Sequence, residues 1–149
     1  MDKPESCPLC ANVLEGEIVR TAQFVIVQAN EPLFPGFTRV VWRDHVAEMT
    51  QLSDRSRHDL MQAVFDVERI MRHVLAPNKV NLASLGNQVP HLHWHVVARW
   101  HDDAAFPASV WSPAAITTAS SQRVRTTLAL LNDYHDALRQ HFQTNHDDQ

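Results

Sequence analysis

The sequence predicts an α+β fold, in which an antiparallel sheet of about five strands carries one long helix and is followed by a C-terminal helix. Several strand-like segments follow one another directly, which is typical of an antiparallel sheet rather than of strict β-α-β alternation. Two long segments repeat apolar residues every three or four positions, as amphipathic helices do. These two patterns favour a sheet covered by helices on one side.

The first half of the chain supplies three of the predicted strands. Residues 18–20 and 24–29 are expected to pair as a hairpin, because β-branched residues fill the second segment and polar residues suit the turn. A loop with two prolines and a glycine follows at residues 30–37. Residues 38–43, with the sequence TRVVWR, form the third strand.

A long helix is predicted over residues 54–75. Ser53 is a suitable N-cap residue, and Pro77 ends the pattern. The apolar residues that recur at helical spacing are Leu60, Met61, Val64, Val67, Ile70, Met71, Val74 and Leu75.

The second half of the chain adds two strands and a helix. Residues 79–85 and 91–98 are predicted strands, and residues 86–90 join them. Residues 100–115 contain too many prolines and small residues to be regular. A second helix is predicted over residues 121–142, and its apolar stripe is Val124, Leu128, Leu131, Leu138 and Phe142.

The 149 residues are enough for one domain with a buried core. We expect residues 1–110 to form this domain and residues 111–149 to form a C-terminal helical extension packed on it. The net charge is −4, and the 13 lysines and arginines are scattered, which disfavours nucleic-acid binding. The N-terminus lacks the apolar core of a secretion signal, and no apolar run is long enough to span a membrane. A cytoplasmic protein with no membrane contact is therefore expected.

The segment HLHWH, residues 91–95, is the most informative part of the sequence. In a strand, His91, His93 and His95 point to one face, while Leu92 and Trp94 point to the other. Buried imidazoles need hydrogen-bond partners, so a row of three indicates an anion site or a metal site. Imidazole is also a capable nucleophile at neutral pH. A solvated, histidine-rich edge strand without function is the alternative.

Residues 91–97 match the pattern H-φ-H-φ-H-φ-φ, where φ is apolar, and so resemble the signature of the histidine triad (HIT) superfamily of nucleotide hydrolases and transferases. The resemblance extends through residues 30–49 and 79–90 and covers roughly residues 7–100. The sequence looks like the bacterial branch that resembles diadenosine tetraphosphate hydrolases. A HIT-like sheet, with residues 1–110 as the HIT domain, is what this resemblance implies.

The resemblance also implies a reaction. His93 would attack the α-phosphorus of a purine nucleotide and form a covalent nucleotidyl-histidine that water then hydrolyses. His95 would hold a phosphate oxygen or assist the leaving group, and the backbone carbonyl of His91 would orient His93. The substrate would be a dinucleoside polyphosphate or a nucleoside phosphoramidate. A homodimer without an organic cofactor is expected.

Further residues of the nucleotide site follow by position in the family. Asn30 falls near the ribose-binding residue, and Asn81 falls near a polar residue of the preceding strand. Ordinary turn chemistry is the alternative for these side chains. The residues that match the glycine-led phosphate loop are Gly86, Asn87 and Gln88.

Phe37 is a departure from the family. Many members have a histidine after Pro-Gly at this point, and that histidine joins the active site, whereas this chain has Pro35-Gly36-Phe37. Phe37 is expected to form an apolar wall for the base or to mark a pocket whose chemistry has changed.

The only two cysteines, Cys7 and Cys10, form a C-x-x-C pair, which indicates either a metal site or a redox pair. The resemblance implies a structural Zn²⁺ site that also includes His45 and His91. Two rival functions remain open. One is a non-catalytic nucleotide- or zinc-binding module, and the other is a metallohydrolase that uses the three histidines as open metal ligands.

Overall fold

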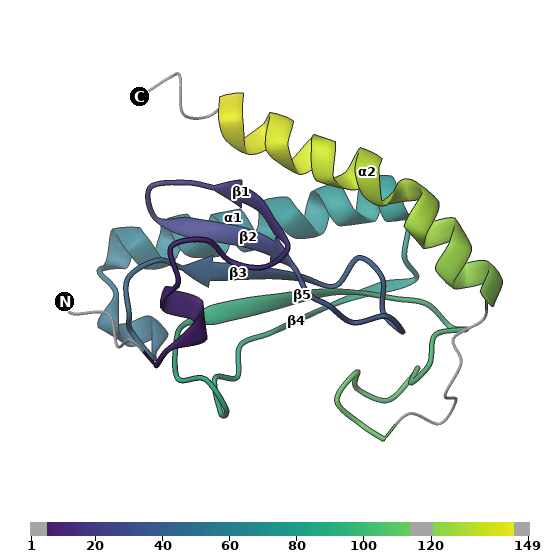
Figure 1. Ribbon diagram of the computed structural model, residues 1–149, viewed down its shortest axis with the longest axis horizontal. Helices are drawn as coiled ribbons and strands as arrows, with labels where there is room; N and C mark the ends of the chain where they lie inside the picture. Colours follow the sequence, from purple (N-terminus) through teal and green to yellow (C-terminus); the bar gives the residue numbers. More distant parts are fainter. Residues whose placement is uncertain (1–5, 114–120, 145–149) are drawn as a thin grey trace.

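A five-stranded antiparallel sheet forms the centre of the computed structural model, which describes residues 6–113 and 121–144. The strands lie in the order β1-β2-β3-β5-β4, and each neighbouring pair is antiparallel. Figure 1 shows the sheet with the helices behind and above it. The strands are β1 (Glu17–Arg20), β2 (Phe24–Gln28), β3 (Thr38–Trp42), β4 (Lys79–Ala83) and β5 (His93–Arg99). The predicted α+β fold is confirmed.

Helix α1 (Asp54–Leu75) has the predicted bounds. Its N-terminus is capped by the Ser53 hydroxyl, which accepts a hydrogen bond from the Ser56 amide at 3.1 Å. Its C-terminus is set by Ala76, which adopts a left-handed conformation with φ of 49° directly before Pro77. The other helices are the short η1 (Pro8–Cys10) and η2 (Met49–Gln51), and α2 (Ser121–Thr144).

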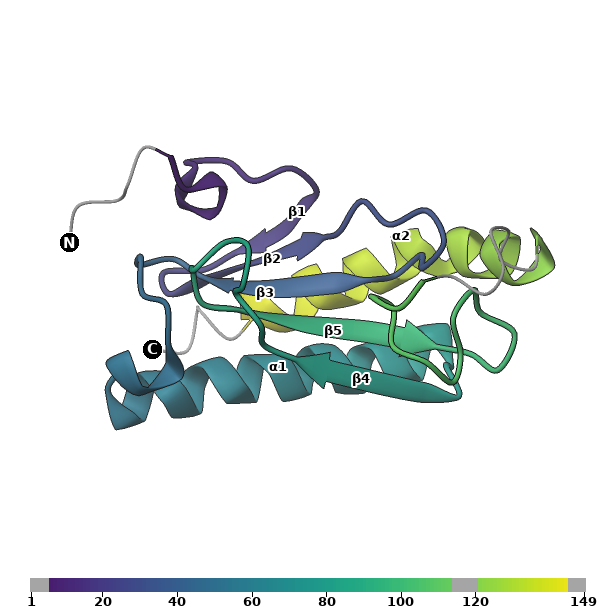
Figure 2. The ribbon, with the colours of Figure 1, turned by 90° about the horizontal axis from the view of Figure 1, so that it is seen from below.

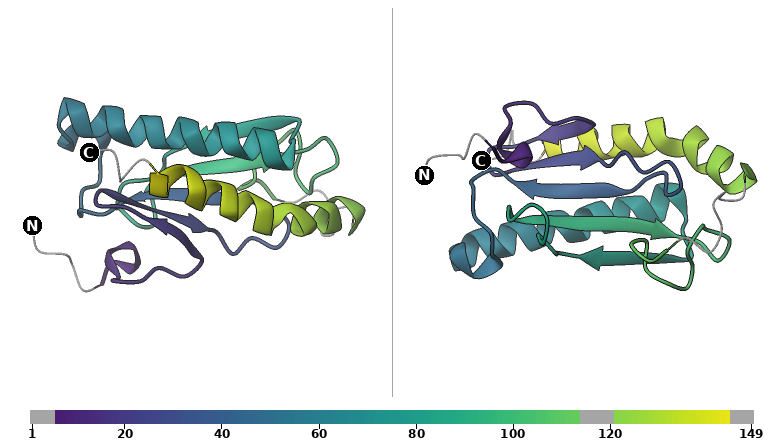
Figure 3. Two further views of the ribbon diagram at one scale, coloured as in Figure 1. Left: turned by 90° about the horizontal axis from the view of Figure 1, so that it is seen from above. Right: turned by 60° about the horizontal axis from the view of Figure 1, so that its bottom comes forward.

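Both long helices lie on the same side of the sheet (Figures 2 and 3). Strand residues that face them, such as Ile26, Val40 and Val96, are fully buried in one core with Leu60 and Leu138 of the helices. Burial of this apolar surface is the main favourable contribution to the stability of the fold. The prediction of a sheet covered by helices on one side is confirmed.

Tyr134 attaches α2 to the sheet through a buried polar contact. Its side chain is completely buried, and its hydroxyl lies 2.9 Å from Oγ1 of Thr38 in β3. The Thr38 hydroxyl donates to the Gly36 carbonyl, so the Tyr134 hydroxyl is the donor in this pair. The two buried hydroxyl groups therefore satisfy each other, which fixes α2 along the sheet.

In the described part of the chain, the opposite face of the sheet is covered at its ends. Leu9 and Leu14 of the N-terminal segment pack over Val25, Val27 and Val41 at one end. The right panel of Figure 3 shows the N-terminal segment at one end and the segment after β5 at the other. A central part of this face remains open for a ligand.

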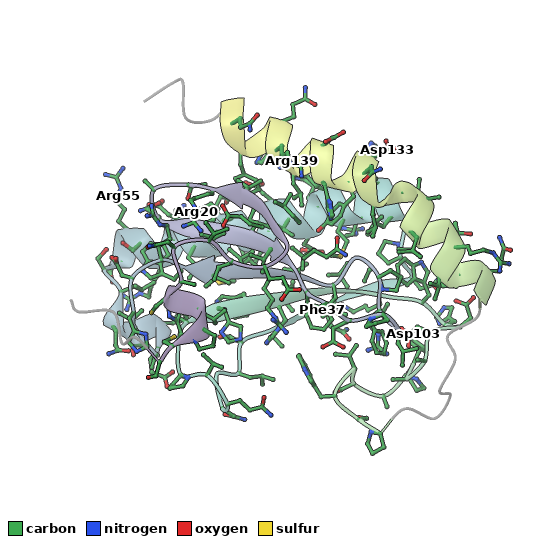
Figure 4. All side chains as sticks on the ribbon, viewed as in Figure 1. Arg20, Phe37, Arg55, Asp103, Asp133 and Arg139 are labelled. Carbon is green, nitrogen blue, oxygen red and sulfur yellow. The ribbon has the colours of Figure 1, made fainter. Side chains whose placement is uncertain are left out.

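An ion pair orders the segment after β5, which the sequence predicts to be irregular. Arg99 Nε lies 2.7 Å from Asp103 Oδ2, and both side chains are buried. The Asp103 carboxylate also accepts hydrogen bonds from the amides of Ala105 and Phe106. Figure 4 labels Asp103 at the end of the molecule where this segment lies. The segment is thereby held against the open face.

The strand β5 begins two residues later than predicted, so the prediction that His91 and Leu92 belong to it is wrong. The Leu92 amide donates to the Val46 carbonyl instead of joining the ladder between β3 and β5. Likewise β4 ends at Ala83 rather than at residue 85. Among the described residues, no helix is long and apolar enough to cross a membrane. Residues 1–5, 114–120 and 145–149 of the predicted domain and extension lie outside the described residues.

The packing of α2 is tested by two leucines of the same helix. Leu138 is fully buried, whereas Leu128 is 52% exposed. Leu138→Ala is expected to lower the free energy of unfolding by about 2–5 kcal/mol, because it leaves a cavity in the core. Leu128→Ala, the matched control, is expected to change it by less than about 0.5 kcal/mol. Urea unfolding followed by circular dichroism measures both, and equal effects would mean that α2 does not belong to the core.

Candidate functional site

A cleft of about 450 Å³ opens on the face of the sheet opposite α1 and α2. His93 and His95 of β5 line it together with Gly86, Asn87 and Gln88 of the loop between β4 and β5. Part of η1 and Trp111 of the segment after β5 complete the lining. The structure therefore brings two of the three predicted catalytic histidines together with the predicted phosphate loop.

His93 is held in one tautomer by a backbone carbonyl. Its Nδ1 lies 2.6 Å from the carbonyl oxygen of His91, which can only accept a hydrogen bond. Nδ1 therefore carries the proton, and Nε2 keeps its lone pair. Burial lowers the pKa of His93, the His91 carbonyl opposes this effect, and the positive Arg39 adds to it. The result is a neutral imidazole with a basic nitrogen available for attack.

His95 lies beside His93, with ring centroids 4.8 Å apart. Its Nδ1 is buried and has no hydrogen-bond partner among the described residues. Burial, the neighbouring His93 and the positive Arg39 together lower the pKa of His95 to about 4. His95 is therefore neutral at pH 7 and can donate one hydrogen bond to a ligand oxygen.

Two aromatic rings enclose His95. The Phe37 ring meets it edge-on with centroids 5.5 Å apart, and the Trp111 ring does so at 5.0 Å. Phe37 is only 2% exposed, so it packs against His95 from the side of the core. These apolar contacts keep water away from His95, and this loss of hydration is the largest cause of its lowered pKa.

Four side chains at the end of the cleft near the N-terminus form a compact cluster: Cys7, Cys10, His45 and His91. Their ligand atoms all lie within 4.8 Å of one another. Sγ of Cys10 is 3.3 Å from Nδ1 of His45 and 3.4 Å from Nδ1 of His91, and the two nitrogens are 3.3 Å apart. A tetrahedral ion with the usual bonds to nitrogen and sulfur separates its ligands by roughly 3.3–3.8 Å. The cluster is therefore suited to bind a metal ion.

His91 belongs to this cluster rather than to a row with His93 and His95, so the predicted row of three is corrected. Its Nε2 donates to the Trp42 carbonyl at 2.6 Å, which leaves Nδ1 free of a proton for a metal. The ring turns toward the cysteines because His91 precedes the strand and its backbone follows a turn. The three imidazoles therefore do not point to one common position, which argues against the rival hypothesis of a metal held by all three histidines.

Three predicted nucleotide-binding residues lie outside the lining of the cleft. Phe37, expected as a wall for the base, is 2% exposed and packs in an apolar cluster with Phe34 and Val97. Asn81 accepts a hydrogen bond from Arg99 at 2.8 Å and lines a separate hollow beyond Trp111. Asn30 lines a neighbouring cavity of about 640 Å³ between the N-terminal segment and α2. This cavity shares Leu9 and Arg39 with the cleft, so the two are adjacent.

Arg39 and Trp111 line the cleft but are absent from the set predicted from sequence. Because side chains alternate along β3, Arg39 lies on the same face as Phe37. This alternation could have predicted Arg39 as a cleft residue once that face was assigned to the site. Trp111 has no comparable signal, because it lies in a segment without regular structure.

Comparisons with known proteins show similarity in sequence and in fold. A family model described as HIT domain matches residues 15–102. The AP-4-A phosphorylase of Mycobacterium tuberculosis is 32% identical over 99 residues, which are 62% of this chain and 51% of that protein. The chain thus spans about half the length of the curated relatives it matches.

Solved structures show the same fold. A histidine triad protein from Bradyrhizobium japonicum has a TM-score of 0.68 and 26% identity, and the match covers 83% of this chain and 87% of that one. A zinc-bound histidine triad family protein from Mycobacterium smegmatis has a TM-score of 0.59 and 19% identity, covering 89% and 95% of the two chains. The second likeness, at its low identity, concerns the fold alone.

The lowered pKa of His95 predicts a measurable titration. The ring is expected to take up its proton near pH 4 instead of near 6.5. As the pH falls, the unfolded chain takes up this proton before the folded chain does. The stability that comes from keeping His95 neutral is therefore complete above about pH 6.5 and is lost as the pH falls toward 4. NMR titration of the histidine rings, with His95→Gln to assign the signal, measures it. A midpoint near 6.5 for His95 would contradict the prediction.

Proposed function

The chain belongs to the HIT domain family, and from this premise we propose that it is a nucleotide hydrolase or transferase that acts at the α-phosphate of a purine nucleotide. The observation that carries the proposal is the hydrogen bond from His93 Nδ1 to the His91 carbonyl, which leaves Nε2 as a nucleophile inside the cleft. The AP-4-A phosphorylase relatives support a dinucleoside polyphosphate as the substrate class. Nucleoside phosphoramidates remain the second candidate class.

In the proposed first step, Nε2 of His93 attacks the α-phosphorus. A bond forms between nitrogen and phosphorus, and the bond from phosphorus to the leaving group breaks, with the electron pair departing on that group. In the second step, water attacks the same phosphorus and displaces His93, which releases a nucleoside monophosphate. Inorganic phosphate in place of water gives a nucleoside diphosphate, as the name of the phosphorylase relatives suggests.

The surroundings of His93 support this chemistry. His95 lines the same cleft and, being neutral, carries one ring N–H that it can donate to a phosphate oxygen. The loop residues Gly86, Asn87 and Gln88 lie at the same cleft and offer amide donors where negative charge develops. Asn30 contributes to the nucleoside side through the adjacent cavity. Asn81 does not reach the nucleotide in this proposal; it helps to hold the segment after β5 through its hydrogen bond with Arg99.

Zn²⁺ is the metal that we propose for the cluster, held by Cys7, Cys10, His45 and His91. Two thiolates and two imidazoles are a usual ligand set for structural zinc, and four protein ligands leave no open position for chemistry. The similar fold from Mycobacterium smegmatis is described as zinc-bound. When bound, the metal ties the N-terminal segment to the turn before β5. We also infer a homodimer and a cytoplasmic location from the family likeness.

A non-catalytic nucleotide-binding module is the rival, and Phe37 favours it. The family resemblance predicts an active-site histidine at this position, and the sequence has phenylalanine instead. Its edge contact with His95 leaves that histidine without the help of another imidazole.

A covalent adduct distinguishes the enzyme from the module. After mixing with diadenosine tetraphosphate or adenosine phosphoramidate and a neutral denaturing quench, intact-protein mass spectrometry is expected to detect one adenylyl group on the native chain. His93→Ala is expected to carry none, and turnover is expected to fall by at least about 10³-fold, because the nucleophile is gone. His58→Ala, which removes an exposed histidine of α1, is the matched control. Nucleotide binding without adduct or turnover in the native protein would favour the module.

The metal proposal is tested by elemental analysis. The purified protein is expected to contain about one zinc per chain, and Cys10→Ser is expected to lose most of it. Loss of the metal is expected to lower the melting temperature by at least about 5 °C, since the N-terminal segment is no longer tied down. His73→Ala, an exposed histidine, serves as the control. Unchanged zinc content in Cys10→Ser would contradict the assignment.

A further inference from the structure

Arg39 stands where the two cavities meet. It lies on β3 directly opposite His95 of β5 in the pairing of these strands, so both side chains project from the same face of the sheet. Arg39 lines the cleft that holds His93 and His95, and it also lines the adjacent cavity of about 640 Å³. A ligand that fills both cavities must pass this side chain.

Arg39 is the only lysine, arginine, aspartate or glutamate among the described residues that line the cleft. His95 does not add to the positive charge at neutral pH, because its pKa lies at about 4. The donors of the loop residues, Asn87 and Gln88, are neutral. Any attraction of the cleft for an anion therefore depends mainly on Arg39.

The Arg39 guanidinium has no carboxylate partner in the described part of the chain. No ion pair includes it there, and its Nε is buried without a hydrogen-bond acceptor. The guanidinium lies over the face of Phe37, whose centroid is 5.7 Å from Cζ. A half-buried cation whose buried Nε–H has no acceptor is costly to retain, unless an anion binds beside it.

We propose that Arg39 binds the non-bridging oxygens of the α-phosphoryl group, between the nucleoside cavity and His93. This inference rests on the proposed function and names the residue that supplies positive charge to that site. A guanidinium at this point attracts the phosphate and stabilises the additional negative charge of the transition state.

A purely structural role for Arg39, as a cation over the Phe37 ring, makes a different prediction. In that case removal of the guanidinium changes stability but not the preference for a phosphorylated ligand. A comparison of adenosine with AMP separates the two roles, because the ligands differ only in the phosphate group.

The experiment measures the binding of AMP and of adenosine to native protein, Arg39→Met and Arg39→Lys by calorimetry. Native protein is expected to bind AMP at least tenfold more tightly than adenosine. Arg39→Met is expected to lose at least tenfold in AMP affinity while its adenosine affinity stays within about twofold, and Arg39→Lys recovers part of the loss. Arg55→Met is the matched control, because it removes an exposed arginine of α1, labelled in Figure 4.

A second readout is the rate at which the adenylyl adduct forms on His93. Arg39→Met is expected to slow it by about 10- to 100-fold, with Arg39→Lys in between. Unchanged AMP affinity and adduct rate in Arg39→Met would overturn the role of Arg39 and leave the proposed function intact. Native protein that binds neither AMP nor adenosine would overturn the proposed function and the role of Arg39 with it.

Discussion

The pairing of β3 with β5 is the constraint on which the candidate site depends. In this register, Arg39 lies opposite His95, and Val41 lies opposite His93. Because side chains alternate along a strand, the same register turns Val40 and Trp94 toward the helices. A shift of one residue would turn the histidines toward the apolar core and expose the core residues to water. The packing of the buried face therefore fixes which side chains lie on the open face.

His91 connects the metal cluster with His93. Its imidazole contributes Nδ1 to the cluster of two cysteines and two histidines and donates from Nε2 to the Trp42 carbonyl. Its own carbonyl accepts the proton of His93 Nδ1. The position and tautomer of His93 thus depend on the same residue that fixes the N-terminal segment. The proposed metal site and the proposed nucleophile would in this way be coupled through one backbone unit.

The cleft combines a low-polarity lining with few charges. Phe37 and Trp111 exclude water from His95, and Leu85 stands exposed at the cleft. In such surroundings each remaining charge acts over a longer range than in water, because the effective dielectric constant is lower. Arg39 therefore has a greater effect here than a surface arginine would have. Phe37 contributes an apolar contact to His95, while Arg39 keeps a positive charge at the cleft.

The sequence by itself determined the elements and the chemical character of the site. The bounds of α1, the antiparallel sheet and the family resemblance all follow from local spacing in the chain, because periodicity reports which residues share a face. The tertiary structure alone decided which faces meet. It turned His91 away from the histidine row toward two cysteines more than eighty positions earlier. It also paired Asn81 with Arg99 through a hydrogen bond and placed Arg39 beside His95. Hydrogen bonds and strand pairs between distant parts of the chain carry no local periodicity, so these contacts arise only when the sheet and its loops are assembled.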